Sequence, residues 1–552
     1  MHGSEISRLP EILLRLLNAR GLKGAALEAY LNPSLKDLAE PQSLPGIEAA
    51  TEVILASVAR KEKIVIFGDY DCDGISATAI LMKTISAIAP EVPLAAFLPD
   101  RLTEGYGMSA PSLKRLLEEH GDVKLVVTVD NGINAVEPVA ALRARGIRVV
   151  ITDHHLPGET GPEADALVNP KVAAPAALES LCGAAVAYML AGALVMEAKR
   201  RGLYAGAPVA GPLLVLAALA TVTDIMPLLG QNRILVSEAL RHFPTWAPMG
   251  LRELHARAAR TGSDRLTSRD FGFLLGPRIN AAGRMSDGRD ALALMMEDDR
   301  EKVRELALKI DRHNDARKRT EQELTNEALK KVVPGAPAQV IDLPEGHPGV
   351  AGIVAARVLE SLHVPVCVLA GGHGSARAPE GFNLREAFVA CAAHLATFGG
   401  HAAAGGFSTK EGEVDAFREA LCAYARAHRT QTSAETTCAP EVWIETSDVT
   451  LDLAEAVTRL EPFGEANPEP VFGIRRALFT EVRSLSQGKH LSFAIASSSH
   501  ASRGSLRGVW WGHGDEVARL KAAPTTPHDI VFSLVVSDYG ERHAELHLRA
   551  IL

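Results

Sequence analysis

Residues 63–74, KIVIFGDYDCDG, pass from a short apolar run into an acidic loop flanked by glycine. Helix-forming sequence follows from about Ser76, so the stretch predicts a buried β-strand, a loop and a helix. The same order of apolar run and acidic loop recurs at 124–134, before the helical stretch 135–145, and again at 147–155. This repetition predicts a parallel sheet with crossover helices.

Acidic residues and histidines stand where these apolar runs end. In an open parallel sheet, ligands bind beyond the carboxyl ends of the strands. We count the run LAALATVTD (216–224) as a fourth strand end. The residues at the four ends are Asp69, Asp71, Asp73, Asp130, Asp153, His154, His155 and Asp224.

This combination of side chains is typical of a metal site that hydrolyses phosphodiesters. Two divalent ions roughly 4 Å apart can activate water and neutralise the charge on phosphoryl oxygens. Such ions take carboxylates, and a Mn²⁺-like ion also takes imidazole. An extended loop would put Asp71 and Asp73 on one face, with Cys72 pointing away. A single Asp-x-Asp or His-His pair is weak evidence, and Asp224 alone can be read as a helix cap, but the joint pattern predicts a metal site.

The rest of the chain predicts a long helix and two further folded units. No proline or glycine occurs from Arg289 to Val333, which predicts one exposed helix; the alternative is two helices with a turn near Asn314-Asp315. Residues 338–342, 354–362 and 364–369 resume an α/β pattern. After about residue 430, short alternating stretches predict an antiparallel β-domain, and 428–440 reads as a linker.

The bulk properties fit a multidomain protein of a reducing compartment. The chain has 552 residues, a net charge of −9 and 47% hydrophobic residues. Its longest apolar stretches, 184–196 and 213–222, fall short of the roughly 20 residues of a membrane span and indicate buried helices. The N-terminus lacks the features of a secretory signal, and six scattered cysteines form no CxxC pair, so we expect a cytoplasmic protein without a membrane partner.

These motifs resemble, in order and spacing, those of the DHH phosphoesterases. The resemblance covers nearly the whole chain, and it is closer to the bacterial RecJ exonucleases than to shorter DHH enzymes. Cys72 and Gly346 depart from the family pattern, which often has a smaller residue and a tryptophan there. The matching segments are GDYDCDG (68–74), VDNGI (129–133), ITDHH (151–155), TVTDIMPL (221–228), GPRINAAGRM (276–285), HPGVAGIVAAR (347–357), GSAR (374–377), GFNLREAF (381–388), FGGHAAAGG (398–406) and LEPFGEANPEPVF (460–472).

The resemblance implies a domain order for the chain. We expect an α/β fold with a parallel-sheet DHH lobe, a long connecting helix, a second α/β DHH-associated lobe and a C-terminal β-barrel of the OB type. The expected limits are an N-terminal helical segment 1–45, the DHH domain 46–288, the connecting helix 289–333, the DHH-associated domain 334–428 and the OB-fold 440–552.

The resemblance also implies roles for individual residues. Two Mn²⁺ or Mg²⁺ ions would be held by Asp71, Asp73, Asp130, His154 and Asp224, with Asp130 as the bridging ligand. His155 would contact the scissile phosphate, and Asp69 would support the site. The residues expected to bind the substrate are Arg101, Arg278, Asn280, Ser375, Arg377 and His401.

The function implied is hydrolysis of single-stranded DNA from its 5′ end to 5′-mononucleotides, in DNA repair and recombination. The alternative enzyme is a DHH hydrolase of short oligoribonucleotides, cyclic dinucleotides or pyrophosphate, although such relatives are shorter. A scaffold without catalysis would lack some acidic ligands, and none is missing here. Expected partners are single-stranded DNA, a single-stranded-DNA-binding protein, and recombination and mismatch-repair factors.

Overall fold

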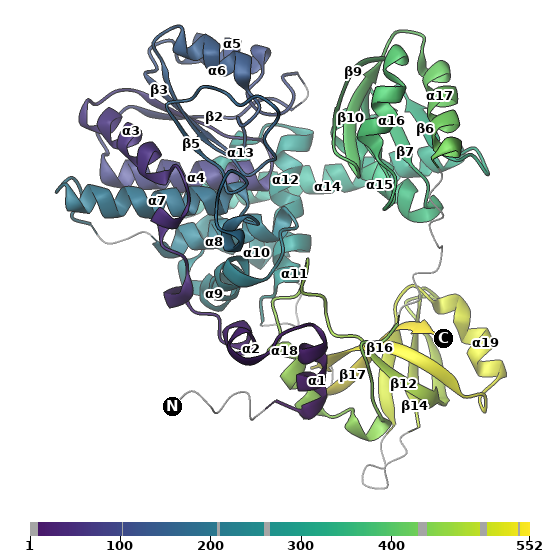
Figure 1. Ribbon diagram of the computed structural model, residues 1–552. Helices are drawn as coiled ribbons and strands as arrows, with labels where there is room; N and C mark the ends of the chain where they lie inside the picture. The colour runs from purple at the N-terminus through teal and green to yellow at the C-terminus, as the bar shows by residue number, and fades with distance from the viewer. Residues whose placement is uncertain are drawn as a thin grey trace.

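The computed structural model describes residues 9–101, 103–206, 210–258, 265–428, 439–496, 505–538 and 541–552. Figure 1 shows a first α/β lobe, a second α/β lobe reached through one long helix, and a C-terminal β-domain. Each of the three contains one of the sheets formed by the described residues. The predicted arrangement of two α/β lobes and a β-domain is therefore confirmed.

Five parallel strands form the sheet of the first lobe, in the order β2-β1-β3-β4-β5. Helices cover both faces, which is why the inner strands are continuous apolar runs. Ile64 and Ile66 face α3, α4, α7 and α8, whereas Val65 and Phe67 face α5 and α6. The bounds are α3 (Ile47–Ala59), β1 (Ile64–Phe67), α4 (Cys72–Ile88), β2 (Leu94–Phe97), α5 (Ala110–Glu119), β3 (Leu125–Val129), α6 (Val136–Arg143), β4 (Arg148–Thr152), β5 (Ala166–Val168), α7 (Gly183–Arg200) and α8 (Ala210–Thr223).

The prediction that Asp224 follows a strand is wrong, and the competing prediction of a buried helix over 213–222 is confirmed, because residues 210–223 form helix α8. The run is apolar on every side, and a fully buried helix cannot be told from a buried strand by periodicity. Its length of 14 residues was the better guide. A helical hairpin and a π-helical turn complete the lobe, with bounds α9 (Gly230–Trp246), α10 (Met249–Ala258), α11 (Ser268–Asp270), the π-helical turn Phe271–Leu275, α12 (Gly276–Met285) and α13 (Arg289–Met296).

The long helix begins later than predicted. Residues 289–296 form the separate helix α13, and α14 (Arg300–Lys330) starts where Asp299 accepts hydrogen bonds from the backbone of Glu301 and Lys302. The predicted alternative break near Asn314 does not occur, since Asn314 is buried within α14. The N-cap residue Asp299, which stands within a stretch without proline or glycine, therefore sets the start of the long helix.

The second lobe has a mixed five-stranded sheet in the order β6-β7-β8-β10-β9. Only β6 and β7 are parallel, and the segment FGGHAAAGGF forms the antiparallel hairpin of β9 and β10. The element bounds are β6 (Gln339–Leu343), α15 (Ala351–Leu362), β7 (Val366–Ala370), β8 (His373–Arg377), α16 (Leu384–Ala390), β9 (Leu395–Gly400), β10 (Ala404–Thr409) and α17 (Val414–Ala427).

The C-terminal domain has a seven-stranded sheet in the order β11-β12-β16-β17-β15-β14-β13. It is mostly antiparallel, although β15 pairs with β17 in parallel and so does β11 with β12. Most of the predicted linker, residues 429–438, lies outside the described residues. The bounds are β11 (Val442–Trp443), α18 (Leu451–Thr458), β12 (Phe472–Ala477), β13 (Phe479–Leu485), β14 (His490–Ile495), β15 (Leu506–Trp510), α19 (Val517–Ala522), β16 (His528–Ser537) and β17 (His543–Ile551).

The N-terminal helices pack on this C-terminal domain. Leu13, Leu16 and Leu17 of α1 (Glu11–Ala19) share a core with α18 and β12, and α2 (Gly24–Leu31) adds Tyr30. The junction with the first lobe is made by Arg233 of α9. Its guanidinium donates hydrogen bonds to the carbonyls of Tyr30, Leu460 and Glu461 at 2.8, 3.1 and 2.9 Å. The N-terminal helices, the C-terminal domain and the first lobe therefore meet at the buried Arg233.

No helix among the described residues is both long enough and apolar enough to cross a bilayer.

Candidate metal centre

Three of the predicted acidic loops meet at one edge of the first sheet. The strands β1, β3 and β4 are neighbours and parallel, so their carboxyl ends lie side by side. Asp69, Asp130 and His154 follow these three ends and are all buried. The sequence therefore placed the strand-end residues in the right position relative to one another.

Asp71 and Asp73 do not lie in an extended loop as predicted, because α4 already begins at Cys72. Asp71 is the N-cap of α4, and its Oδ1 accepts hydrogen bonds from the backbone N–H groups of Asp73 and Gly74, both at 3.0 Å. Asp73 lies in the first turn of the helix, and its carboxylate points to the N-terminus of α7. The side chain of Cys72 is buried in the core, as expected.

The carboxylate of Asp73 is held by the N-terminus of α7. The backbone N–H groups of Gly183 and Ala184 donate to its Oδ2 and Oδ1, each at 2.7 Å. Gly183 also lets α7 approach Asp130 closely, since a Cβ there would lie 2.6 Å from the Cβ of Asp130. Asp130 itself has a left-handed φ of 61°. Gly183 is a site residue that the sequence interpretation missed, because it belongs to none of the motifs.

Asp224 reaches the same site from the end of α8. Its backbone N–H still donates to the carbonyl of Ala220 at 2.8 Å, as in a last helical turn. The next residue, Ile225, has a left-handed φ of 57° that turns the chain away from the helix axis. A helix end thus supplies the fourth side of a site whose other sides are strand ends.

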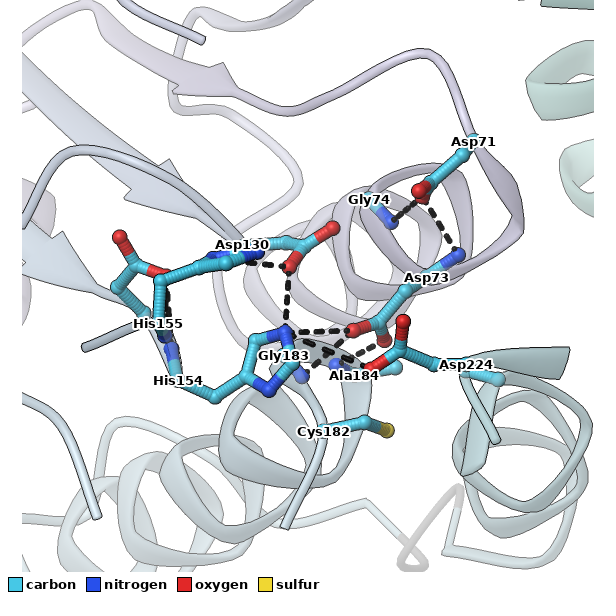
Figure 2. A network of polar contacts seen from close by, with 12 residues as sticks. Asp71, Asp73, Gly74, Asp130, His154, His155, Cys182, Gly183, Ala184 and Asp224 are labelled. Atoms are coloured by element: carbon cyan, nitrogen blue, oxygen red, sulfur yellow. Dashed lines mark hydrogen bonds and ion pairs between the residues drawn. The ribbon is translucent and has the colours of Figure 1, made fainter. Parts of the chain in front are cut away.

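The imidazole of His154 lies at the centre of the carboxylates (Figure 2). Its Nε2 is 3.1 Å from Asp130 Oδ1, 3.5 Å from Asp73 Oδ2 and 3.6 Å from Asp224 Oδ2. Asp130 Oδ1 is buried, and within the described part of the chain it has no partner with hydrogen-bond geometry. Ligands about 2.1 Å from one octahedral ion lie about 3 Å apart, so this spacing suits donors that share a cation.

Asp153 supports the two histidines and is not part of the carboxylate cluster. Its Oδ1 accepts from the backbone N–H of His154 and, at 2.8 Å, from Nδ1–H of His155. Burial lowers the pKa of His155, but the hydrogen bond and charge of Asp153 outweigh it, so the pKa is raised. The hydroxyl of Tyr106 donates to the carbonyl of Asp130 at 2.7 Å and contacts His155. Tyr106 was missed as a site residue, although it lies in the segment that carries Arg101.

The cluster carries more negative charge than its surroundings balance. Burial, followed by repulsion from neighbouring aspartates, raises the pKa of Asp69, Asp71, Asp130 and Asp224. Burial lowers the pKa of His154, which keeps the imidazole neutral and able to act as a ligand.

Candidate ligand atoms within 4.8 Å of one another form three groups: Asp73 with His154 and Asp224, Asp69 with Asp71 and Asp130, and Asp130 with His154 and His155. Asp130 and His154 are shared between groups, so the residues fit a pair of divalent cations.

Two of the predicted phosphate-binding residues converge on the N-terminus of α15. Ser375 and Arg377 lie on β8, and a Cβ at Gly352 would be 3.0 Å from Arg377 Nη2 and 3.5 Å from Ser375 Oγ. Burial, and then the charge of Arg101, lower the pKa of Arg377, so the two arginines are near one another. The Arg101 guanidinium lies over the ring of Tyr70, 4.9 Å from its centroid.

Arg284 is a further buried cation of this region that was not singled out from the sequence. Burial and the charge of Arg101 lower its pKa to about 10. Its Nη1 donates to the carbonyl of Gly349 in the second lobe at 3.2 Å, and its own carbonyl packs on Gly349. Its position in GPRINAAGRM was the available signal. Arg284 therefore joins the first lobe to the second and adds a positive charge near Arg101.

Two other predicted substrate residues already hold protein partners. Arg278 Nε donates to Asp311 Oδ1 of α14 at 2.8 Å, and its Nη1 donates to the carbonyl of Leu274. Asn280 Oδ1 accepts from the backbone N–H of Cys72 at 2.7 Å, which positions the start of α4. A role of these two side chains in phosphate binding stays a prediction.

The remaining predicted residues lie outside the cluster. His401 is exposed at the turn between β9 and β10, where its N–H donates to the carbonyl of Ala404. Gly346 packs against the Leu343 carbonyl and Ala370, a space that a tryptophan would not enter unchanged. Of the adjacent tryptophans in the C-terminal domain, Trp510 is buried and Trp511 is 53% exposed.

Three family models match the chain in the order expected. The N-terminal domain of the DHH family matches residues 63–221, the DHHA1 domain matches 335–427, and the RecJ OB domain matches 441–550.

The curated relatives include the single-stranded-DNA-specific exonuclease RecJ of *Haemophilus influenzae*, 33% identical with 85% of this chain and 84% of that protein covered. RecJ of *Bacillus subtilis* is 31% identical, and the match covers 90% of this chain but only 63% of that protein. The crystal structure of *Thermus thermophilus* RecJ in complex with Mn²⁺ has a TM-score of 0.80 at 30% identity, covering 99% of this chain and 78% of that one. The chain therefore belongs to the RecJ family of single-stranded-DNA-specific exonucleases within the DHH superfamily.

Proposed function

We propose that this chain hydrolyses single-stranded DNA from its 5′ end to 5′-mononucleotides with the help of two divalent cations. The observation that carries the proposal is the meeting of four aspartates and His154 at one end of the first sheet, in a RecJ-family chain. Every acidic residue of the expected ligand set is present and buried or half-buried. A scaffold without activity would have no reason to keep so much unbalanced charge in its interior.

We propose Asp71, Asp73, Asp130, His154 and Asp224 as the metal ligands, with Asp130 shared and Asp69 beside it. A *T. thermophilus* RecJ crystal structure with Mg²⁺, at 29% identity and a TM-score of 0.74, accompanies the one with Mn²⁺, and both ions suit this donor set. When bound, a divalent pair neutralises phosphoryl charge and lowers the pKa of the attacking water.

The protein's own groups prepare the substrate for attack. Tyr106 and Gly183 hold Asp130 in its left-handed conformation between strand and helix. His155, whose pKa is raised by the hydrogen bond and charge of Asp153, is aimed by that hydrogen bond and can donate to a phosphate oxygen of the scissile group. Asp153 thus acts as a positioning residue for His155.

Recognition of the strand end falls to the basic residues between the two lobes. Ser375 and Arg377 lie near the N-terminus of α15, where backbone dipoles and guanidinium donors favour a phosphate. Burial, and then the charge of Arg101, lower the pKa of Arg377, and a bound anion would offset both effects. We extend this set by Arg284 and keep Arg278, Asn280 and His401 as weaker candidates.

The C-terminal domain supports a polymeric substrate over small nucleotides. The RecJ OB model covers residues 441–550, and OB-folds bind single strands by stacking and charge. We propose the expected domain limits 1–45, 46–288, 289–333, 334–428 and 440–552 as the working division, in which residues 289–296 form the separate helix α13 and the long helix α14 begins at Arg300.

The proposal extends to the protein partners of the chain and to its location in the cell. We propose a single-stranded-DNA-binding protein and recombination or mismatch-repair factors as partners, because a strand-end nuclease needs access to unpaired DNA. A cytoplasmic location is supported by the five free cysteines of the described residues, all of which are buried without a disulfide.

The test is digestion of end-labelled single-stranded DNA with the 5′ or the 3′ terminus blocked, under Mn²⁺ and under Mg²⁺. Release of 5′-mononucleotides that stops when the 5′ terminus is blocked supports the proposal. Faster turnover of short RNA or cyclic dinucleotides than of long DNA would overturn it.

A further inference from the structure

The two most exposed large apolar side chains of the described residues are Phe273, at 72%, and Ile225, at 69%. Both line one cavity. Ile225 directly follows the candidate metal ligand Asp224 in the chain. Large apolar surface next to a charged site marks a binding function more often than an accident of folding.

The backbone at both positions is arranged to present these side chains. Ile225 adopts a left-handed φ of 57°, which is unfavourable for a β-branched residue. Phe273 stands in the π-helical turn Phe271–Leu275 that precedes α12. A π-helical turn is uncommon and occurs mostly at functional sites. Neither feature is needed to fill a core, since both side chains point to solvent.

The cavity is a groove of about 620 Å³ between the first lobe and the C-terminal domain. Figure 1 shows α11, which leads into the π-helical turn, at the side of the first lobe that faces this domain. The apolar lining of the groove consists mainly of Ile225, Met226, Leu228, Phe273, Phe463 and Pro468.

The wall formed by the C-terminal domain is fixed. The backbone N–H of Leu228 donates to the carbonyl of Glu465 at 2.8 Å, and Ser268 Oγ donates to the carbonyl of Phe463 at 2.6 Å. The groove is therefore preformed.

The charges around the groove suit a ligand with flat apolar faces on an anionic backbone. The guanidinium of Arg269 lies over the Phe273 ring, 5.6 Å from its centroid. Of the three acidic residues in the wall, Glu461 is paired with Arg265 at 3.1 Å and Glu469 with Arg549 at 2.7 Å. The third, Glu465, is exposed to solvent, so water screens its charge. The cation at the aromatic rim can meet a phosphate while the ring meets a base.

We infer that this groove binds unpaired nucleobases of the substrate strand next to the scissile position, with Phe273 as the stacking platform and Ile225 as the apolar guide. The inference rests on the proposed function. Every base has a π-face, so such a platform accepts any sequence. Bases within a duplex have no free face to offer, so the groove also favours single strands over duplex.

The direct test uses 5′-phosphorylated single-stranded DNA with one 2-aminopurine placed at successive positions, bound to the Asp130→Asn protein to prevent degradation. We expect the emission to fall at a restricted position near the 5′ end. Adding Phe273→Leu should remove this quenching, whereas adding Phe273→Trp should keep it, because only the latter retains an aromatic face. The same emission profile with leucine as with phenylalanine would overturn the inference.

A kinetic test in the otherwise unaltered protein separates this inference from the proposed function. Phe273→Leu should raise the KM for single-stranded DNA roughly fivefold or more, the lower end of what one stacked base contributes. The control is Met196→Ala, an exposed apolar side chain of α7 that does not line the groove, and it should leave KM unchanged.

An unchanged KM with Phe273→Leu would refute base binding and assign the groove to a protein partner. A failure of the proposed function is a different result, since the wild-type chain itself would then not degrade single-stranded DNA.

Discussion

Arg233 is the residue whose loss we expect to separate the C-terminal domain from the first lobe. Its guanidinium is buried and donates to three backbone carbonyls from two distant segments, at 2.8 to 3.1 Å. It also lies over the ring of Tyr30, 3.8 Å from the centroid. The hydroxyl of Tyr30 in turn lies 2.9 Å from two acceptors, the carbonyl of Leu460 and Asn467 Oδ1, which share its one proton.

The magnitude follows from what Arg233→Met leaves behind. Methionine keeps the apolar stem but removes every donor, so the carbonyls of Tyr30 and Glu461 lose their charged partner. The Leu460 carbonyl keeps the hydrogen bonds from Tyr30 and Asn467. Each buried acceptor left unsatisfied costs about 1–3 kcal/mol, and partial hydration recovers some of that cost, so we expect the junction to lose about 2–4 kcal/mol.

Hydrogen exchange of segments 24–31 and 451–460 measures this loss locally, which is needed because several domains need not unfold together. The matched control is Arg241→Met on the same helix α9. Its side chain is 58% exposed and pairs with Glu238, which keeps His242 at 3.6 Å, and it contacts neither segment, so their protection should stay at the wild-type level. Equal protection of both segments in the two variants would refute the account of the junction.

Three further predictions concern the metal centre and its rim. Gly183→Ala places a Cβ 2.6 Å from that of Asp130 and should lower the affinity for Mn²⁺ tenfold or more, about 1.4 kcal/mol, in titration calorimetry. The control Gly192→Ala, on the same helix, meets only Pro41 Cγ at 3.1 Å and should leave the Mn²⁺ affinity unchanged. Tyr106→Phe removes the 2.7 Å hydrogen bond to the Asp130 carbonyl and should lower kcat/KM on single-stranded DNA about tenfold, with little change in melting temperature. Full activity of this variant would contradict the role of Tyr106. Ile225→Gly relieves a left-handed φ and should raise the free energy of unfolding by about 0.5–1 kcal/mol, while it weakens DNA binding. A loss of stability in a denaturant titration would show that the strain argument is wrong.

Local sequence pattern was sufficient to locate the strand-end residues of the site. Asp69, Asp130 and His154 follow β1, β3 and β4 because short apolar runs ending in acidic loops have few other folds available. The parallel order of those strands then brings the residues together without any further information.

Long-range packing was beyond such patterns. The apolar run before Asp224 was predicted both as a strand end and, over 213–222, as a buried helix, and it is a helix; periodicity does not decide between the two in a fully buried segment. Gly183 matters only because α7 happens to approach Asp130, and Arg233 only because α2 and the Leu460 loop lie beside α9. Motif content alone assigned Arg278 and Asn280 to the substrate, whereas the structure engages both with other protein groups.

The most direct test of the central claim is the number of Mn²⁺ ions bound per chain, measured by calorimetry and by electron paramagnetic resonance. We predict two for the wild-type protein, with the spin coupling of neighbouring ions, and loss of that coupling in Asp130→Asn while the circular dichroism spectrum stays unchanged. No Mn²⁺ bound by the wild-type chain, or a coupled pair that persists in Asp130→Asn, would contradict it.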